Sequence, residues 1–157
     1  MSDDLPIGPN ALVSLREVTS ETVRTICRLS DTLKPPQNHM VAPNAVSIAE
    51  AHFEPNAWFR AIYADETPVG FIMLYDAPED PVYFLWRLMV AAPYQGKGFG
   101  RRAVELLIDR VKTRPGATEL GVSCHEGDDG PEGFYRKLGF RRNGKMYGDE
   151  VGLALTL

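Results

Sequence analysis

Tyr83-Phe-Leu-Trp-Arg-Leu-Met-Val-Ala-Ala-Pro-Tyr-Gln-Gly-Lys-Gly-Phe-Gly100 is the stretch that decides the fold. Its first eight residues form an apolar run typical of a strand, and the glycine-dense turn leads into an amphipathic helix. The apolar face of that helix comprises Ala103, Val104, Leu107, Ile108 and Val111. A turn at this place leaves N–H groups without intrahelical partners, and the helix dipole adds about half a positive charge there. The sequence therefore predicts a phosphate-binding loop.

The spacing of the glycines argues against the two common nucleotide-binding loops. A Walker A loop has Ser or Thr after its lysine, whereas Gly98 follows Lys97 here. A dinucleotide-binding turn has a third glycine three residues after the second, and Arg101 stands at that position. An ordinary turn before a helix, with no ligand, is the structural alternative.

Outside this stretch, the hydrophobic pattern predicts a single α/β domain over residues 11–157, preceded by a disordered tail over residues 1–10. Helices are expected over residues 20–33, over 47–53 with Ser47 as its cap, from the glycine turn to about 114, and over 131–138. The expected strands span residues 11–17, 58–63, 69–75, 83–90, 119–124, 140–143 and 151–157. The predicted sheet is mixed, with an antiparallel N-terminal part and a parallel pair around the long helix.

Composition narrows the class of protein. The chain has 157 residues, of which 44% are hydrophobic, and a formal net charge of -4. Nucleic-acid-binding proteins normally present a basic face, so we expect no nucleic-acid partner and favour a cationic ligand. No apolar run approaches the ~20 residues of a membrane span, and the N-terminus does not resemble a signal peptide. We expect a cytoplasmic protein without a membrane partner.

The cysteines and histidines do not predict a metal site. Cys27 and Cys124 are too few and too far apart for a disulfide framework. The histidines at positions 39, 52 and 125 lack metal-ligand spacing, so no metal is expected. A homodimer is possible on the general frequency of two-fold assemblies alone.

Two segments resemble a known family. Gln95, Gly98 and Gly100 match the pattern Gln/Arg-x-x-Gly-x-Gly/Ala of the acetyl-CoA pyrophosphate loop in the GNAT superfamily of N-acetyltransferases. The stretch Gly133-Phe-Tyr-Arg-Lys-Leu-Gly-Phe140 resembles the later helix-to-strand motif of that superfamily. Within it, residues 38–51, 69–73, 87–90 and 148–151 are most similar to bacterial spermine/spermidine acetyltransferases.

The resemblance implies direct transfer of the acetyl group of acetyl-CoA to a primary amine in a ternary complex. In that family the parallel pair is splayed, and the strand before the loop holds the pantetheine arm through its main chain. This implicates Leu88, Met89 and Val90, with an N–H near Val90 polarising the carbonyl. The implied pyrophosphate loop comprises Gln95, Gly96, Lys97, Gly98, Phe99, Gly100 and Arg101.

Tyr135 matches the family tyrosine that acts as general acid. A phenol with a pKa near ~10 is protonated at pH 7 and can give its proton to the departing CoA thiolate. The alternative is a helix residue that only packs its ring. Seven residues earlier, Asp128 stands where many family members carry a cofactor-binding asparagine, although a carboxylate cannot donate as an amide does.

The sequence leaves the base and the acceptor amine open. Ordered water or one of several side chains could take the proton; these are Glu50, Glu54, His125, Glu126 and Glu150. The narrower resemblance implies a polyamine such as spermidine or spermine, which suits a groove of carboxylates and aromatic rings. The predicted substrate-binding residues are Glu50, Glu54, Tyr83 and Glu150. An aminoglycoside, an arylalkylamine, an amino acid or a protein N-terminus is an alternative acceptor, and a non-catalytic acyl-CoA sensor is an alternative function.

Overall fold

A seven-stranded mixed sheet with the order β1-β2-β3-β4-β5-β7-β6 forms the centre of the computed structural model, which describes residues 7–127 and 129–157. Only β4 and β5 are parallel; the other neighbours are antiparallel. The strands are β1 (Val13–Arg16), β2 (Ala57–Ala64), β3 (Thr67–Ala77), β4 (Val82–Val90), β5 (Glu119–His125), β6 (Arg141–Tyr147) and β7 (Glu150–Thr156). This confirms the predicted single-domain α/β fold.

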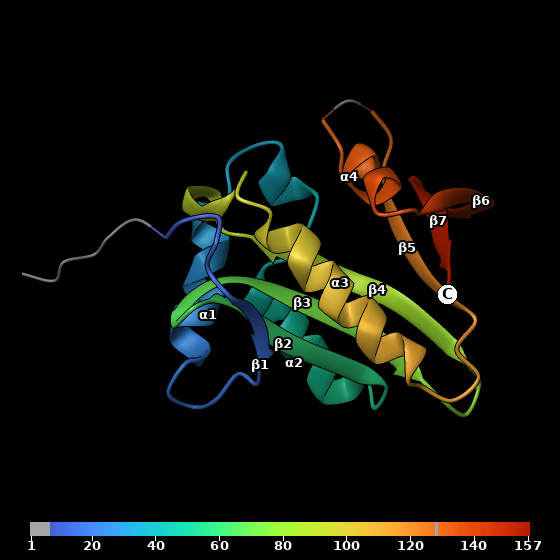
Figure 1. Cartoon of the computed structure of the whole chain (residues 1–157), viewed down its shortest axis with the longest axis horizontal. Coiled ribbons are helices and arrows are strands. Elements are labelled where there is room, and N and C mark those ends of the chain that lie inside the picture. Colours follow the sequence, from blue (N-terminus) through green and yellow to red (C-terminus); the bar gives the residue numbers. More distant parts are fainter. Residues whose placement is uncertain (1–6, 128) are drawn as a thin grey trace, which may run out of the picture.

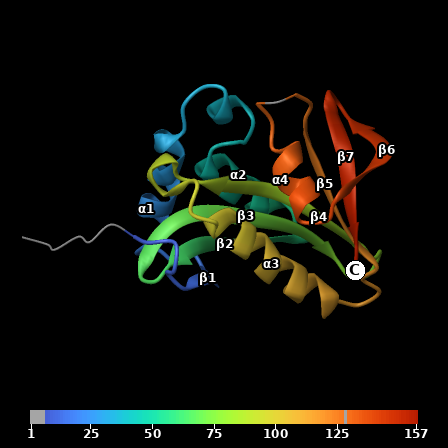
Figure 2. The same ribbon diagram turned by 45° about the horizontal axis from the view of Figure 1, so that its top comes forward.

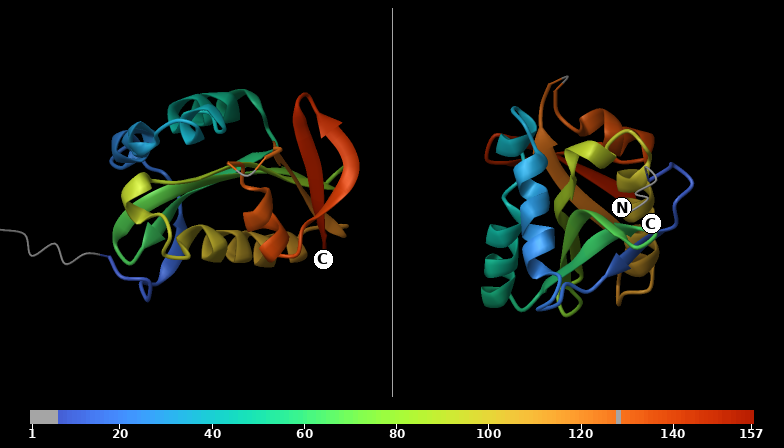
Figure 3. Two further views of the ribbon diagram at one scale, coloured as in Figure 1. Left: turned by 90° about the horizontal axis from the view of Figure 1, so that it is seen from above. Right: turned by 90° about the vertical axis from the view of Figure 1, so that its left-hand side faces the viewer.

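The helices form two layers around the sheet. They are α1 (Val23–Arg28), α2 (Asn44–Phe53), α3 (Phe99–Lys112) and α4 (Glu132–Lys137), with short 3-10 turns η1 (Leu29–Thr32), η2 (Gln37–His39) and η3 (Ala92–Tyr94). Helices α1 and α2 cover one face of the sheet, and α3 and α4 lie on the other (Figures 1 and 3). Each layer has its own hydrophobic core, because strand side chains alternate between the faces. The α3 side buries Val104, Leu107 and Phe140, and the α1 side buries Ile26 and Phe71.

The parallel pair is short, which opens the sheet. Strands β4 and β5 pair only at Phe84–Gly121 and Leu85–Val122. Beyond these residues they diverge, and β5, β7 and β6 lean away from β4 (Figure 2). The ring of Phe84 lies over Gly121, where an added Cβ would be 2.9 Å from the ring. The structure thus confirms the splayed parallel pair.

Two local predictions need correction. The predicted helix over residues 20–33 is a six-residue α1 followed by the 3-10 turn η1. Helix α2 begins at Asn44, after Pro43, so Ser47 is a buried residue in its second turn and not its cap. Proline favours a helix start because its φ angle is already close to helical.

The predicted tail includes residues that are attached to the domain. Residues 1–6 lie outside the described part of the chain. Residues 7–10 pack near α3, where Nη2 of Arg102 donates to the carbonyl of Pro9 at 2.7 Å and Nη1 to that of Ala11 at 2.6 Å. Among the described residues, no helix combines the length and apolar character needed to cross a membrane.

Candidate active site

The gap between β4 and β5 is part of one continuous cleft of about 990 Å³. Its walls come from four regions of the chain: the segment before α2, the end of β4 with the glycine loop, the end of β5 with the start of α4, and the β6–β7 turn. The lining residues are Leu33, Gln37, residues 39–42, residues 84–90, Tyr94–Gly96, Gly98–Arg101, residues 122–125, residues 129–131, Phe134, Tyr135, Tyr147, Asp149 and Glu150.

The glycine loop presents main-chain donors to this cleft. Gly96 and Gly98 have φ angles of 77° and 83°, in the left-handed region that favours glycine. Among the described residues, the N–H groups of residues 96–101 donate to no main-chain carbonyl. They stand at the N-terminus of the 14-residue helix α3, where the dipole favours an anion. The loop therefore has the donors and the charge that a pyrophosphate requires.

The side chains of the loop differ in what they contact. Nε2 of Gln95 donates to the carbonyl of Val90 at 2.8 Å and to Oε1 of Gln37 at 2.9 Å, so Gln95 fixes the loop against β4 and η2. Phe99 is buried in the core. Arg101 lines the cleft and pairs with Glu105 at 3.0 Å. Lys97 does not line the cleft.

The end of β4 offers main-chain groups to the gap. The N–H of Ala91 donates to the carbonyl of Val69, so Ala91 faces β3 and its neighbour Val90 faces the opposite way. The carbonyl of Val90 is bound by Gln95, whereas its N–H lies on the edge of β4 that β5 has left. Leu88, Met89 and Val90 all line the cleft, although the Met89 side chain also packs into the α1-side core.

Tyr135 lies in the wall opposite β4. Its side chain is 6% exposed, lines the cleft, and packs edge-on against Phe134 and Phe140. Burial is the main cause that raises the pKa of the Tyr135 phenol well above its ordinary value, with smaller contributions from Cys124 and Glu150. The phenol is therefore protonated throughout the neutral range and can serve as a proton donor.

The other end of the cleft carries charged side chains. Glu150 and Asp149 line it from the start of β7 and the turn before it, and Asp149 lies 3.8 Å from Nδ1 of His125. Arg87 lines it from β4 and contacts Glu50 of α2 at 3.4 Å. Carboxylates at this place favour a ligand with positively charged groups.

Several predicted residues lie outside the cleft lining. Tyr83 is 3% exposed, and its hydroxyl donates to the carbonyl of Pro115 at 2.5 Å, so it belongs to the core. Glu54 ends α2, and its Oε1 accepts from the N–H of Asn56. Glu50 reaches the cleft only through Arg87. Asp128 lies outside the described residues.

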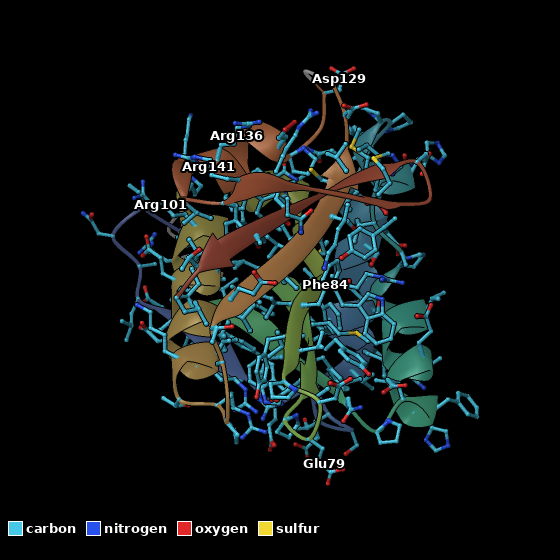
Figure 4. The ribbon with its side chains drawn as sticks, turned by 90° about the vertical axis from the view of Figure 1, so that its right-hand side faces the viewer. Glu79, Phe84, Arg101, Asp129, Arg136 and Arg141 are labelled. Carbon is cyan, nitrogen blue, oxygen red and sulfur yellow. The ribbon has the colours of Figure 1, made fainter. Side chains whose placement is uncertain are left out.

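Acidic side chains also occur on loops that lie far apart. Glu79, on the β3–β4 turn, and Asp129, on the loop after β5, lie at opposite ends of the molecule (Figure 4). Phe84 is labelled between them, on β4. Only Asp129 of the two acidic residues lines the cleft.

Sequence reasoning missed a whole wall of the cleft. Gln37 and residues 39–42 contribute from the segment before α2, which the sequence marked only through its resemblance to a subfamily and not as part of a site. Trp86 and Ser123 lie within apolar strands, so the sequence did not show that they line the cleft. The one available signal was the position of Ser123 and His125 near the C-terminal end of a parallel strand, where ligands gather in open α/β sheets.

Cys124 lines the cleft but is not suited to nucleophilic attack. Burial is the largest of the causes that raise its pKa to about 11, so the thiol is protonated at neutral pH. Within the described part of the chain, no group of three or more His, Cys, Asp or Glu side chains is placed to hold a metal ion.

Comparison with known proteins agrees with this architecture. The chain is 32% identical to an L-2,4-diaminobutyric acid acetyltransferase of Streptomyces avermitilis over 84 residues, which are 53% of this chain and 47% of that protein. A second such enzyme, of Streptomyces coelicolor, is 29% identical over 80 residues, or 50% of this chain and 47% of that one. The chain thus spans about half the length of these curated relatives.

Solved structures share the fold. An acetyltransferase from Thermus thermophilus superposes with a TM-score of 0.69 at 18% identity, covering 92% of this chain and 97% of that one. The PaiA N-acetyltransferase of Thermoplasma acidophilum, solved with coenzyme A, gives 0.65 at 18% identity, covering 93% and 99%. The acetyltransferase (GNAT) family model matches residues 25–140, and the chain belongs to this family, whose members use acetyl-CoA as co-substrate.

Proposed function

We propose that this protein transfers the acetyl group of acetyl-CoA directly to a primary amine of a small aliphatic molecule. The observation that carries the proposal is the continuity of the cleft. It joins an anion-binding glycine loop, a free main-chain edge, a buried tyrosine and a set of carboxylates in one space.

Acetyl-CoA would supply an acetyl thioester, and the chain has groups suited to each part of that molecule. The main chain of residues 96–101 would bind the pyrophosphate, with Arg101 nearby for charge. The open edge of β4 at Leu88 and Val90 would hold the pantetheine arm. The N–H of Val90 would donate to the thioester carbonyl oxygen and stabilise the negative charge that develops there.

Proton transfer completes the reaction. The amine nitrogen forms a bond to the carbonyl carbon, the carbon–sulfur bond breaks, and the amine loses a proton. Tyr135 gives its proton to the departing sulfur, a role supported by its place in the wall and by its protonation at neutral pH. The proton from the amine leaves through water or through His125 or Glu150, which line the cleft.

The proposed acceptor carries at least two amines. Glu150 and Asp149 would bind an ammonium group that is not being acetylated. Spermidine and spermine, which the narrower resemblance favours, fit this description. So does 2,4-diaminobutyric acid, the compound in the names of the sequence relatives. We take both kinds of molecule as the acceptor class to test.

The test is release of CoA thiol from acetyl-CoA with a panel of amines: spermidine, spermine, putrescine, 2,4-diaminobutyrate, ornithine, an aminoglycoside and an arylalkylamine. We expect turnover that depends on an aliphatic diamine or diamino acid. Turnover with the aminoglycoside or arylalkylamine alone would keep the reaction and reject the acceptor class. Tight acetyl-CoA binding without turnover on any amine would instead favour a sensor.

A further inference from the structure

Among the described residues, Arg87 is the one that lines the cleft and also has a buried side-chain donor without a hydrogen-bond partner. It lies beside a β-bulge, because Met73 is opposite Arg87 while Leu74 is opposite Leu85, which leaves Trp86 as an extra residue. Bulges re-aim the side chains next to them. The bulge lies directly after the last β4 residue that pairs with β5, where the gap opens. Arg87 is 19% exposed there and lines the cleft.

The Arg87 guanidinium has five N–H donors and weak partners. Its Nη2 is 3.4 and 3.5 Å from the two carboxylate oxygens of Glu50, whereas charge-assisted hydrogen bonds are usually about 2.7–2.9 Å long. Its Nη1 donates to the carbonyl of the adjacent Trp86 at 3.2 Å. Its Nε is buried and has no hydrogen-bond partner among the residues that the structure describes.

Two other arginines of this protein form much closer pairs with carboxylates. Arg16 holds Glu66 with bonds of 2.9 and 3.0 Å, and Arg142 holds Glu132 with bonds of 2.6 and 2.9 Å. Both of these arginines are more exposed than Arg87. A buried donor without a partner is unfavourable, so the open donors of Arg87 indicate a site for an anion.

The location of Arg87 suggests which ligand brings that anion. Its partner Glu50 belongs to α2, on one face of the sheet, whereas the glycine loop begins α3, on the opposite face (Figure 3). The phosphates of acetyl-CoA are already matched by that loop, so the anion belongs to the acceptor. A guanidinium can bind the two oxygens of one carboxylate through a pair of parallel N–H groups.

We propose that Arg87 binds the carboxylate of an amino-acid acceptor, held in place by Glu50. The preferred substrates are then diamino acids acetylated on the amine remote from the carboxylate, with Glu150 and Asp149 facing the amino groups. This inference rests on the proposed function and narrows its acceptor class. A polyamine has no group for Arg87 and places a positive charge next to it.

Matched pairs of substrates test the inference, since 2,4-diaminobutyrate differs from 1,3-diaminopropane only in the carboxylate, as ornithine does from putrescine. The quantity measured is the ratio of kcat/KM within each pair. We expect the diamino acid to be preferred at least about tenfold by the natural protein. Arg87→Met should lower that ratio about 10- to 100-fold, the value of a hydrogen-bonded charge, and Arg87→Lys should lower it less.

Arg60→Met is the matched control. Arg60 is also a half-buried sheet arginine, 25% exposed and stacked on Trp58 at 4.4 Å, but it lies outside the cleft, so the ratio should stay unchanged. An unchanged ratio in Arg87→Met, even with both rates lowered, would overturn the inference. So would a natural protein that acetylates the diamines as well as the diamino acids, although the proposed function would stand. Failure with every amine would overturn both.

Discussion

One end of the cleft is formed by main-chain groups and the other by side chains. The loop end consists of consecutive residues, and it offers main-chain N–H groups at a helix N-terminus. The charged end consists of side chains from separate elements: Arg87 from β4, His125 from β5, and Asp149 and Glu150 at the β6–β7 turn. Tyr135 lines the same cleft, from helix α4.

Because of this difference, the groups that would bind the common ligand are separate from those that would select the acceptor. Main-chain donors depend on backbone conformation and tolerate little change, so they fix the common ligand of a family. Side chains can be exchanged without altering the backbone, so they decide which acceptor enters. The following changes test whether the two ends are independent in this way.

Tyr135→Phe should have the largest effect. It removes the proposed acid without touching either end, so the rate of acetyl transfer should fall by about 10²–10⁴. Acetyl-CoA affinity, measured by calorimetric titration, should be nearly unchanged, because the loop is intact. An unaltered rate would remove Tyr135 from the mechanism and leave only its packing role.

Gly98→Ala should damage the loop end selectively. A side chain at a φ of 83° costs about 1–3 kcal/mol, so the loop will shift or strain and acetyl-CoA affinity should fall about tenfold or more. The KM for the amine should change much less. Gly133→Ala is the control, because it too has open space but lies inside helix α4 without a positive φ. Equal losses in both variants would show that the effect does not come from the conformation of the loop.

Tyr83→Phe should affect stability and not the reaction. The Tyr83 hydroxyl is used in the hydrogen bond to Pro115, away from the cleft, so its loss should lower the free energy of unfolding by about 0.5–1.5 kcal/mol. Urea unfolding would measure this change, and steady-state kinetics should match those of the natural protein. A raised KM for the amine would restore Tyr83 as a substrate contact.

Glu132→Gln should give the smallest effect, visible only in its pH dependence. The hydrogen bond from Arg142 is the main cause that lowers the pKa of Glu132 from 4.5 to about 2. A carboxyl with a lowered folded-state pKa stabilises the fold above pH 4.5, and the contribution disappears as pH falls toward 2. Melting temperatures of the two proteins should therefore differ at pH 7 and converge in acid. A difference that persists unchanged at pH 2 would contradict the assignment.

The backbone conformation of the loop end could be predicted from the sequence because that end is local. Its glycines, the preceding strand and the following helix are contiguous, and their spacing records the backbone conformation directly. Tyr135 was found for the same reason, through a motif of eight neighbouring residues. The sheet and its helices followed from hydrophobic periodicity.

The charged end could not be assembled in this way. Arg87 and Glu50 are 37 positions apart yet paired with each other, and no local pattern brings them together. The misplacement of Tyr83 has a related cause. A strand buried on both faces is apolar throughout, so its sequence does not tell which side chains face a ligand and which face a helix. The bulge at Trp86 shifts that alternation further.

The pair formed by Gln37 and Gln95 connects two walls of the cleft. Each amide is the other's partner, at 2.9 and 3.3 Å, and Gln95 in addition holds the end of β4. In the proposed reaction, a ligand that orders the glycine loop would therefore also favour one position of the segment before α2. Coupling of this kind would be reciprocal, so acetyl-CoA and the amine would change each other's affinity by the same factor.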